Sequence, residues 1–147
     1  MTNTDKNDFN ATIGNTVLSA VHLAPYLPYE LRFSDGTILH SIDIDNELML
    51  LDTKTSGISN HRIEWGCILP ILRPMTDLTK KIKINNVEII VKENLSKNLQ
   101  MMIDVFDIPS IEDIKVYDYN KLLELHFDVF GLIEKGLAVD INTLSVE

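Results

Sequence analysis

Residues 60–78, NHRIEWGCILPILRPMTDL, constrain the fold of this chain more than any other stretch. They include the only tryptophan, the only cysteine and two of the five prolines, together with a long run of large apolar residues. Globular proteins bury such side chains most often, so we expect this stretch to form the centre of the core. Alternation over residues 61–65 predicts a strand, and Pro70, which has no N–H to donate, predicts the end of regular pairing. The residues expected in the core are Ile63, Cys67, Ile68, Leu69, Ile71 and Leu72.

Upstream of this stretch, alternation of apolar and polar residues predicts a β-hairpin. Asp35 and Gly36 separate an apolar segment at residues 31–33 from a longer alternating segment at residues 37–44. The Asp-Gly pair is a strong short-range signal for a hairpin turn. Because side chains alternate between the two faces of a strand, one face of the second strand is expected to be buried. That face carries Ile38, His40, Ile42 and Ile44.

A further strand and a second hairpin are predicted downstream. Residues 47–52 are apolar enough to be covered on both faces of a sheet, whereas residues 54–60 have the composition of a loop. Residues 81–91 alternate again on either side of Asn85 and Asn86. Asparagine tolerates the positive φ angles of a tight turn, so residues 81–91 are predicted to form a hairpin.

After residue 94 the apolar spacing becomes that of helices. The first predicted helix buries Leu95, Leu99, Met102, Ile103 and Phe106. Asp118 is predicted to cap the last helix, which carries Leu122, Leu123, Phe127 and Phe130. The chain is therefore predicted to be a small α+β domain, with antiparallel strands and hairpins in the first two thirds and two helices toward the C-terminus. Residues 1–10 are predicted to be a polar flexible leader, and residues 11–147 to be the single domain.

Composition limits the classes of function that are open to the chain. A chain of 147 residues suits one domain that buries about two thirds of its unfolded surface. The net charge of −9 repels phosphate and disfavours nucleic-acid binding, whereas an acidic surface suits a basic groove on a partner protein. A lone cysteine forms no intramolecular disulfide, and no run of 18 apolar residues is present. These features predict a cytoplasmic protein that is neither exported nor inserted in a membrane.

The motifs of metal sites and of common catalytic sites are missing. The four histidines are widely spaced and the single cysteine forms no thiolate cluster, so neither a metal nor another cofactor is expected. Asp43, Asp45 and Glu47 are spaced like the start of a calcium loop, but Leu48 stands where that loop requires glycine. Cys67 is expected to be a buried, inert side chain. We therefore predict that the protein is not an enzyme and assign no catalytic residue.

Four side chains are candidates for binding a ligand or a partner. A tryptophan beside an arginine and a histidine on a strand can stack on a base or cap an aromatic pocket, which singles out His61, Arg62 and Trp65. In the alternative interpretation, Trp65 fills the core while Arg62 and Glu64 point to solvent. Arg73 is the fourth candidate, because the stiff backbone between two prolines presents its guanidinium at little entropic cost; the alternative is an ordinary surface position.

Three separate blocks carry a family resemblance: residues 24–29 (APYLPY), 70–80 (PILRPMTDLTK) and 127–140 (FDVFGLIEKGLAVD). Together these blocks resemble a group of short uncharacterised proteins associated with Bacteroidetes phages, prophages and related mobile elements. The resemblance implies an accessory factor that contacts a host or phage protein, or that sequesters a small molecule. It implies no activity and no catalytic residue.

Three functional hypotheses follow. The leading one is a non-enzymatic protein that binds another protein, with a second copy of the chain among the candidate partners. Its alternative is a small-molecule or nucleotide-binding protein that uses His61, Arg62, Trp65 or Arg73 around a pocket. The third is an enzyme whose site is not visible in the sequence.

Overall fold

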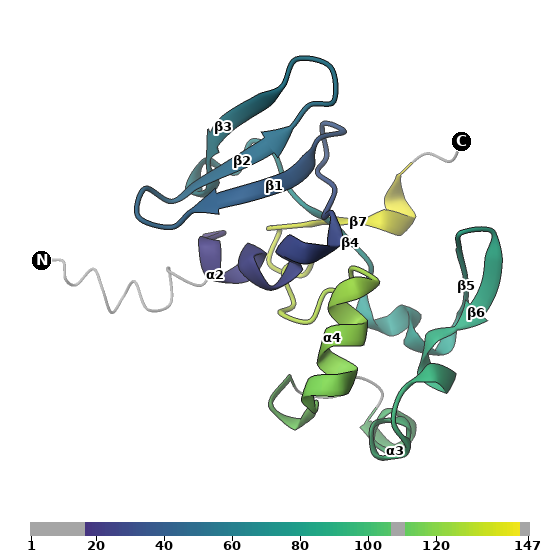
Figure 1. The fold of residues 1–147 in the computed structure, drawn as a ribbon. Coiled ribbons are helices and arrows are strands. Elements are labelled where there is room, and N and C mark those ends of the chain that lie inside the picture. Colours follow the sequence, from purple (N-terminus) through teal and green to yellow (C-terminus); the bar gives the residue numbers. More distant parts are fainter. Residues whose placement is uncertain (1–16, 107–110, 145–147) are drawn as a thin grey trace, which may run out of the picture.

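The computed structural model describes residues 17–106 and 111–144, so the leader predicted at residues 1–10 lies outside the described residues. The fold is α+β, as predicted: a three-stranded sheet lies at one end, a pair of helices at the other, and a two-stranded pairing between them (Figure 1). The strands are β1 (Ile38–Asp43), β2 (Leu48–Asp52), β3 (Ile58–Arg62), β4 (Ile71–Leu72), β5 (Lys81–Ile84), β6 (Val87–Ile90) and β7 (Val139–Asp140). The helices are α2 (Ala20–Leu23), α3 (Lys97–Phe106) and α4 (Val116–Glu124).

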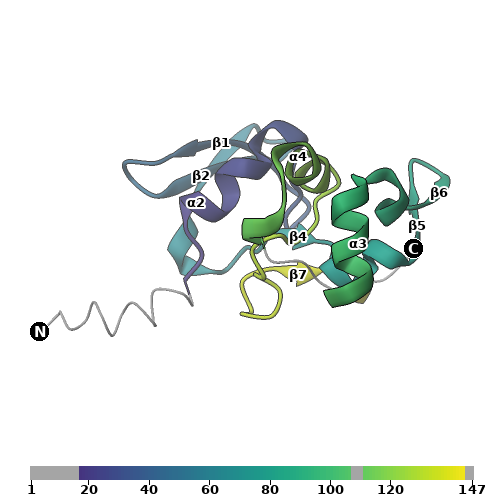
Figure 2. The same cartoon turned by 90° about the horizontal axis from the view of Figure 1, so that it is seen from below.

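Short 3-10 helices connect many of these elements. They are Ala24–Tyr29, Ile63–Trp65, Met75–Thr79, Val91–Asn94, Ile111–Asp113 and Ile141–Thr143. Seen from below, α3 and the β5–β6 hairpin lie on one side of the molecule, and α2 with the β1–β2 strands lies on the other (Figure 2). One cluster of buried side chains joins these parts. Among residues 17–106 and 111–144, no helix has the length and apolarity needed to cross a membrane.

The first predicted hairpin is present at Asp35 and Gly36. Gly36 adopts a φ of 90°, and Asp35 Oδ1 accepts hydrogen bonds from the backbone N–H of Thr37 at 3.1 Å and from its hydroxyl at 2.6 Å. Residues 31–33 do not form a continuous strand. They form only isolated bridges, from Arg32 to Ile38 and from Phe33 to the distant Pro70.

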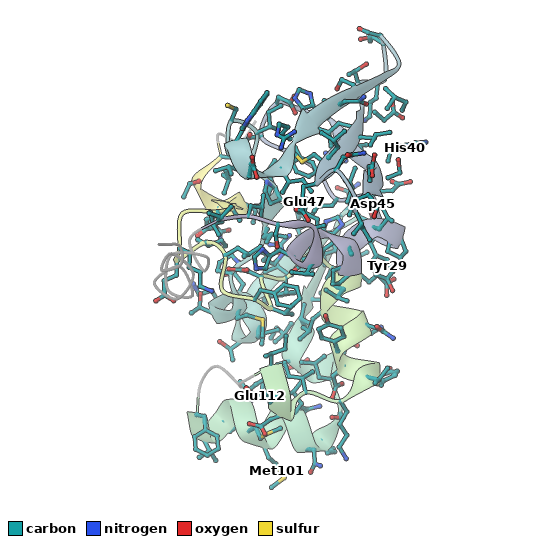
Figure 3. The ribbon with its side chains drawn as sticks, turned by 90° about the vertical axis from the view of Figure 1, so that its left-hand side faces the viewer. Tyr29, His40, Asp45, Glu47, Met101 and Glu112 are labelled. Carbon is teal, nitrogen blue, oxygen red and sulfur yellow. The ribbon has the colours of Figure 1, made fainter. Side chains whose placement is uncertain are left out.

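A β-bulge interrupts the regular alternation that was predicted for β1. The register passes from Leu39 opposite Leu51 to Ser41 opposite Leu50, which leaves His40 as the extra residue. A one-residue slip moves each side chain to the other face of a strand. Leu39 and Ile42, on either side of the bulge, consequently lie opposite the buried Leu51 and Met49, and His40 points outward from the sheet (Figure 3).

The predictions for the next two strands also need correction. β2 is not covered on both faces: Met49 and Leu51 are buried, whereas the alternate residues are partly accessible. β3 begins at Ile58, inside the predicted loop, because a short turn at residues 53–57 suffices to return the chain to β2. β3 ends at Arg62, and a 3-10 turn replaces the strand predicted over residues 61–65.

Pairing does not stop at Pro70, contrary to the prediction. β4 follows it directly and lies parallel to β7, with Ile71 opposite Val139. The Pro70 carbonyl accepts a hydrogen bond from the Val139 N–H at 2.8 Å. Proline lacks only a donor, so the first position of a strand tolerates it while its carbonyl still pairs. The C-terminal segment is thereby attached to the centre of the molecule.

The predictions for the second half of the chain hold in outline. β5 and β6 form the expected hairpin, with Asn85 and Asn86 at positive φ, and both predicted helices are present. Asp118 does not cap α4, because Lys115 precedes that helix and Asp118 lies buried inside it. Three aromatic residues also depart from their predicted places: Phe106 is exposed, and Phe127 and Phe130 follow the end of α4.

Candidate functional site

Trp65 is exposed on the surface, which decides between the two interpretations of its position. Its side chain is 66% exposed, whereas Ile63 is fully buried. In a strand these two residues would share one face. A 3-10 helix turns about 120° per residue, so the turn over Ile63–Trp65 buries the isoleucine and directs the tryptophan outward. The same turn, ended by Gly66 at a φ of 69°, leaves Cys67 exposed, so its predicted burial is wrong.

His61 and Arg62 lie beside Trp65 at the end of β3. Arg62 is paired with Glu64 across 3.5 Å, and both side chains are about half exposed. His61 is half-buried on the face that also carries Met49, and its Nε2 lies 3.1 Å from the Ser59 hydroxyl. Three of the four candidate residues therefore cluster at the end of β3, where Trp65 and the Arg62–Glu64 ion pair are exposed and the His61 imidazole is half-buried on the other face of the strand.

Arg73 lies elsewhere, in the centre of the molecule. Its side chain is only 14% exposed and its Nη1 lies 3.8 Å from Asp77 Oδ2. The same Asp77 oxygen accepts a hydrogen bond from Asn142 Nδ2 at 2.9 Å, while the buried Arg73 Nε has no hydrogen-bond partner among the described residues. Burial lowers the pKa of Arg73, and the carboxylates of Asp77 and Asp140 partly offset this shift. Arg73 thus belongs to an internal network that ties the 3-10 helix Met75–Thr79 to the C-terminal segment.

The outer edge of β3 has free hydrogen-bonding groups. Two hydrogen bonds show which alternate residues of β3 bond to β2: Thr53 N to Gly57 O at 3.0 Å and Ile63 N to Glu47 O at 3.1 Å. In an antiparallel pair, alternate residues direct both their N–H and C=O groups to the same neighbour. Odd-numbered β3 residues therefore bond to β2. Ile58, Asn60 and Arg62 direct their backbone groups away from the sheet, where no strand among the described residues pairs with them.

The two edges of this sheet differ in how they are protected. β1 carries the bulge at His40, and its first residues are covered by residues 31–33, since the Leu39 N–H donates to the Leu31 carbonyl at 2.8 Å. β3 pairs in regular register over all five of its residues. It contains neither lysine nor proline, which are the residues that commonly block a free edge. β3 is therefore the edge that remains open to another strand.

A concavity of about 370 Å³ lies apart from this cluster. It is lined by Pro74, Met75, Thr76, Asp128, Val129, Gly131, Ile133 and Glu134. Burial raises the pKa of Asp128, but its oxygens are held by the backbone N–H groups of Leu132 at 2.7 Å and Ile133 at 2.9 Å. The described lining includes two carboxylates and no basic side chain, so it does not suit a phosphate. None of the four candidate binding residues lines it.

The outer face of α3 is a second exposed apolar surface. Met101, Val105 and Phe106 are 63%, 72% and 69% exposed, and together with Asn98 and Met102 they line a shallow groove. Met101 lies at the end of the molecule opposite the sheet (Figure 3). The sequence contained a signal that was missed: Met101 and Val105 are four residues apart and lie off the buried face of the helix.

The blocks at residues 24–29, 70–80 and 127–140 meet in the centre of the fold. The Arg73 N–H donates to the His126 carbonyl at 2.8 Å, and the Asp128 N–H donates to the Arg73 carbonyl at 2.8 Å. The Tyr26 hydroxyl donates to the Phe127 carbonyl at 2.5 Å. The segments that carry the family resemblance are thus one structural junction, although they are far apart in the sequence.

His126 makes the stability of this junction depend on pH. Its Nε2 lies 2.6 Å from the Tyr29 carbonyl, so the ring donates a hydrogen bond. Burial lowers the pKa of His126 below its ordinary 6.5; Arg32 and Arg73 lower it further, while the Tyr29 bond and Glu30 act in the opposite direction. The folded protein therefore resists protonation that the unfolded chain accepts. Stability should be fully present above about pH 6.5 and should decrease as the pH falls below it.

We expect chemical denaturation between about pH 7.5 and about pH 5 to show this decrease, and His126→Asn to reduce its slope. Asparagine suits the φ of 63° at this position. Burial and Lys135 also lower the pKa of His22, so part of the slope should remain. Asn60→Thr, an exposed substitution that leaves every histidine in place, is the control and should leave the slope as in the parent protein. An unchanged slope in the His126 variant would contradict the prediction.

The comparisons with known proteins provide no relative for this site. No protein-family model matches the chain, and neither the curated proteins nor the solved structures contain a match. Over residues 17–106 and 111–144, no group of three or more His, Cys, Asp or Glu side chains is arranged to hold a metal ion. The candidate site is therefore defined by the geometry of the described residues alone.

Proposed function

We propose that the protein acts without catalysis, by binding another polypeptide chain along the outer edge of β3. One observation carries this proposal: the N–H and C=O groups of Ile58, Asn60 and Arg62 point outward from an unpaired edge, and the turn that follows this strand exposes Trp65. In strand addition, main-chain hydrogen bonds provide affinity and the neighbouring side chains provide specificity. A large exposed tryptophan is the type of residue that anchors protein interfaces.

The side chains near the edge have distinct roles in this proposal. Ile58 and Arg62 flank the incoming strand on the exposed face of the sheet, where Ile58 offers apolar contact. Arg62 and Glu64 provide one charge of each sign. Trp65 covers the end of the added strand. The half-buried His61 lies on the opposite face, next to the apolar layer that contains Met49.

The proposed setting is the cytoplasm of a bacterial host. It rests on the lone cysteine and on the resemblance of residues 24–29, 70–80 and 127–140 to proteins of Bacteroidetes phages and mobile elements. In that setting the protein would be an accessory factor that contacts a host or phage protein. The acidic net charge of −9 supports binding to protein in preference to nucleic acid.

Replacing Asn60 by proline should abolish binding at this edge while the fold persists. The Asn60 N–H points away from β2, so proline removes an outward donor without breaking the β2–β3 ladder. Asn60→Thr, which keeps the N–H and suits a strand, is the matched control. A photo-crosslinker placed at position 67, which is exposed close to Trp65 in the chain, should yield the same adduct in the expressing cells for the parent protein and Asn60→Thr, and no adduct for Asn60→Pro. An adduct that survives in Asn60→Pro, or no adduct in any variant, would overturn the proposal.

A further inference from the structure

We infer that the chain occupying the β3 edge is a second copy of the protein, paired antiparallel to the first about Asn60. This inference rests on the function proposed above. The outward-facing residues are Ile58, Asn60 and Arg62, and this set is symmetric about its middle member. A two-fold axis at Asn60 uses all three residues on both strands, and each facing pair then exchanges two backbone hydrogen bonds.

The side chains on the exposed face are compatible with this register. Ile58 of each copy faces Arg62 of the other, so the isoleucine packs against the aliphatic part of the arginine. The two Arg62 side chains lie at opposite ends of the paired region. Four residues of strand separate them by about 13 Å, which exceeds the screening length of about 8 Å at physiological salt. Like charges therefore do not meet across the axis.

The side chains on the opposite face of β3 are also compatible with this register. Ser59 of each copy faces His61 of the other at a pair where the side chains approach closely. Within one chain the same two side chains already lie 3.1 Å apart, so they are chemically suited to share a hydrogen bond. Both lie on the face of Met49 and Leu51. Pairing therefore continues this face of the sheet from one copy to the next, with the polar Ser59–His61 pairs between the two apolar layers.

Beyond β3 the same register places Trp65 against the turn at residues 53–57 of the second copy. Lys54 is exposed in that turn, and it brings a cation near the Trp65 ring and the Glu64 carboxylate of the first copy. Glu64 is half exposed and so remains available for this contact. The complementary charges at both ends of the interface support a second copy as the occupant.

The sheet also limits the assembly to a dimer. The interface is isologous and uses the β3 edge of both copies, which closes the assembly. The remaining outer edges are β1 strands, which carry the bulge at His40 and the covering residues 31–33. Each copy has a net charge of −9, so repulsion between copies opposes pairing. Added salt screens this repulsion and should strengthen the dimer, whereas it would weaken binding to a basic partner.

A charge-swap series tests the register directly. Ile58→Lys places a cation opposite Arg62 at both ends of the interface, and should raise the concentration needed for dimerisation about tenfold or more. Ile58→Lys combined with Arg62→Glu restores opposite charges at both ends and should recover the dimer. The measurement is sedimentation velocity from about 1 µM to about 1 mM, followed in parallel by fluorescence of the only tryptophan, whose emission should shift to shorter wavelength as Trp65 is covered.

Each outcome of this series is informative. Ile58 is partly exposed, so circular dichroism should show that both variants remain folded, and Asn60→Pro provides an independent variant that should be monomeric. A parent protein that stays monomeric throughout, or a double variant that does not recover, would overturn the inference. If the parent is monomeric but still forms an Asn60-dependent adduct with a different protein, only the second copy is excluded. If the parent protein is monomeric and forms no such adduct, both this inference and the proposed function are wrong.

Discussion

Replacing Tyr26 by alanine is expected to lower the free energy of unfolding by about 3–5 kcal/mol, the usual cost of removing a buried aromatic ring. The side chain of Tyr26 is fully buried. Its ring packs edge-on against Phe130, with centroids 6.4 Å apart, and its hydroxyl donates to the Phe127 carbonyl at 2.5 Å. Burial raises the pKa of Tyr26, which keeps the hydroxyl protonated as a donor. The substitution therefore removes both the packing and the polar link that join residues 24–29 to residues 127–130.

Tyr26→Phe separates these two contributions. It retains the ring and removes one of the two donors to the Phe127 carbonyl, which still accepts from the Val129 N–H at 3.0 Å. This loss should cost about 0.5–1.5 kcal/mol. Urea denaturation followed by circular dichroism would measure both variants. Tyr117→Ala is the control, because Tyr117 is 65% exposed and its removal should change stability by less than about 0.5 kcal/mol. If the alanine variant at position 26 were no less stable than this control, the junction would not depend on Tyr26.

Local chemistry made some elements predictable from the sequence. The β5–β6 hairpin follows from Asn85 and Asn86, which accept the positive φ angles that the turn requires. α3 and α4 follow from apolar spacing that only a helix turns into one buried face. In each case the residues that determine the element lie within the element itself.

Elements that depend on distant contacts were not predictable. β4 and β7 are two residues long and pair although nearly half of the chain separates them, which leaves no periodic signal. The bulge at His40 interrupts the alternation of β1 without any glycine or proline to mark it. Asp118 has the residue type of a cap, but it accepts hydrogen bonds from Ser96, which precedes a different helix. Only the tertiary structure distinguishes the two roles.

The geometry of the candidate site was not predictable from the sequence. The sequence singled out His61, Arg62 and Trp65 by residue type, and left open whether Trp65 was buried. The 3-10 turn over Ile63–Trp65 settles that point, because Ile63 occupies the core and the tryptophan is turned outward. Residues 58–65 alone do not determine that β1 is the protected edge of the sheet. They also do not determine which residues of β3 direct their backbone groups outward.

Replacing Asp118 by alanine is expected to lower the free energy of unfolding by about 2–4 kcal/mol, because it removes two charge-assisted hydrogen bonds from a buried site. Asp118 is 1% exposed. Its carboxylate accepts from the Ser96 N–H at 2.9 Å and from the Ser96 hydroxyl at 2.5 Å. The same hydroxyl oxygen accepts from the Leu99 N–H at 3.3 Å. Asp118 on α4 thus orients the residue that caps α3, and its loss weakens both the cap and the contact between the helices.

A double-mutant cycle distinguishes this relay from two independent effects. Ser96→Ala alone should cost about 1–2 kcal/mol, the usual range for an N-cap. If Asp118 acts through Ser96, the double variant should cost at least about 1 kcal/mol less than the sum of the single variants. Asp104→Ala is the control: its carboxylate is 61% exposed and pairs with Lys92 at the surface, so it should cost less than about 1 kcal/mol. Additive costs in the cycle would show that the Asp118 carboxylate stabilises the fold through contacts other than Ser96, and that α3 is capped without it.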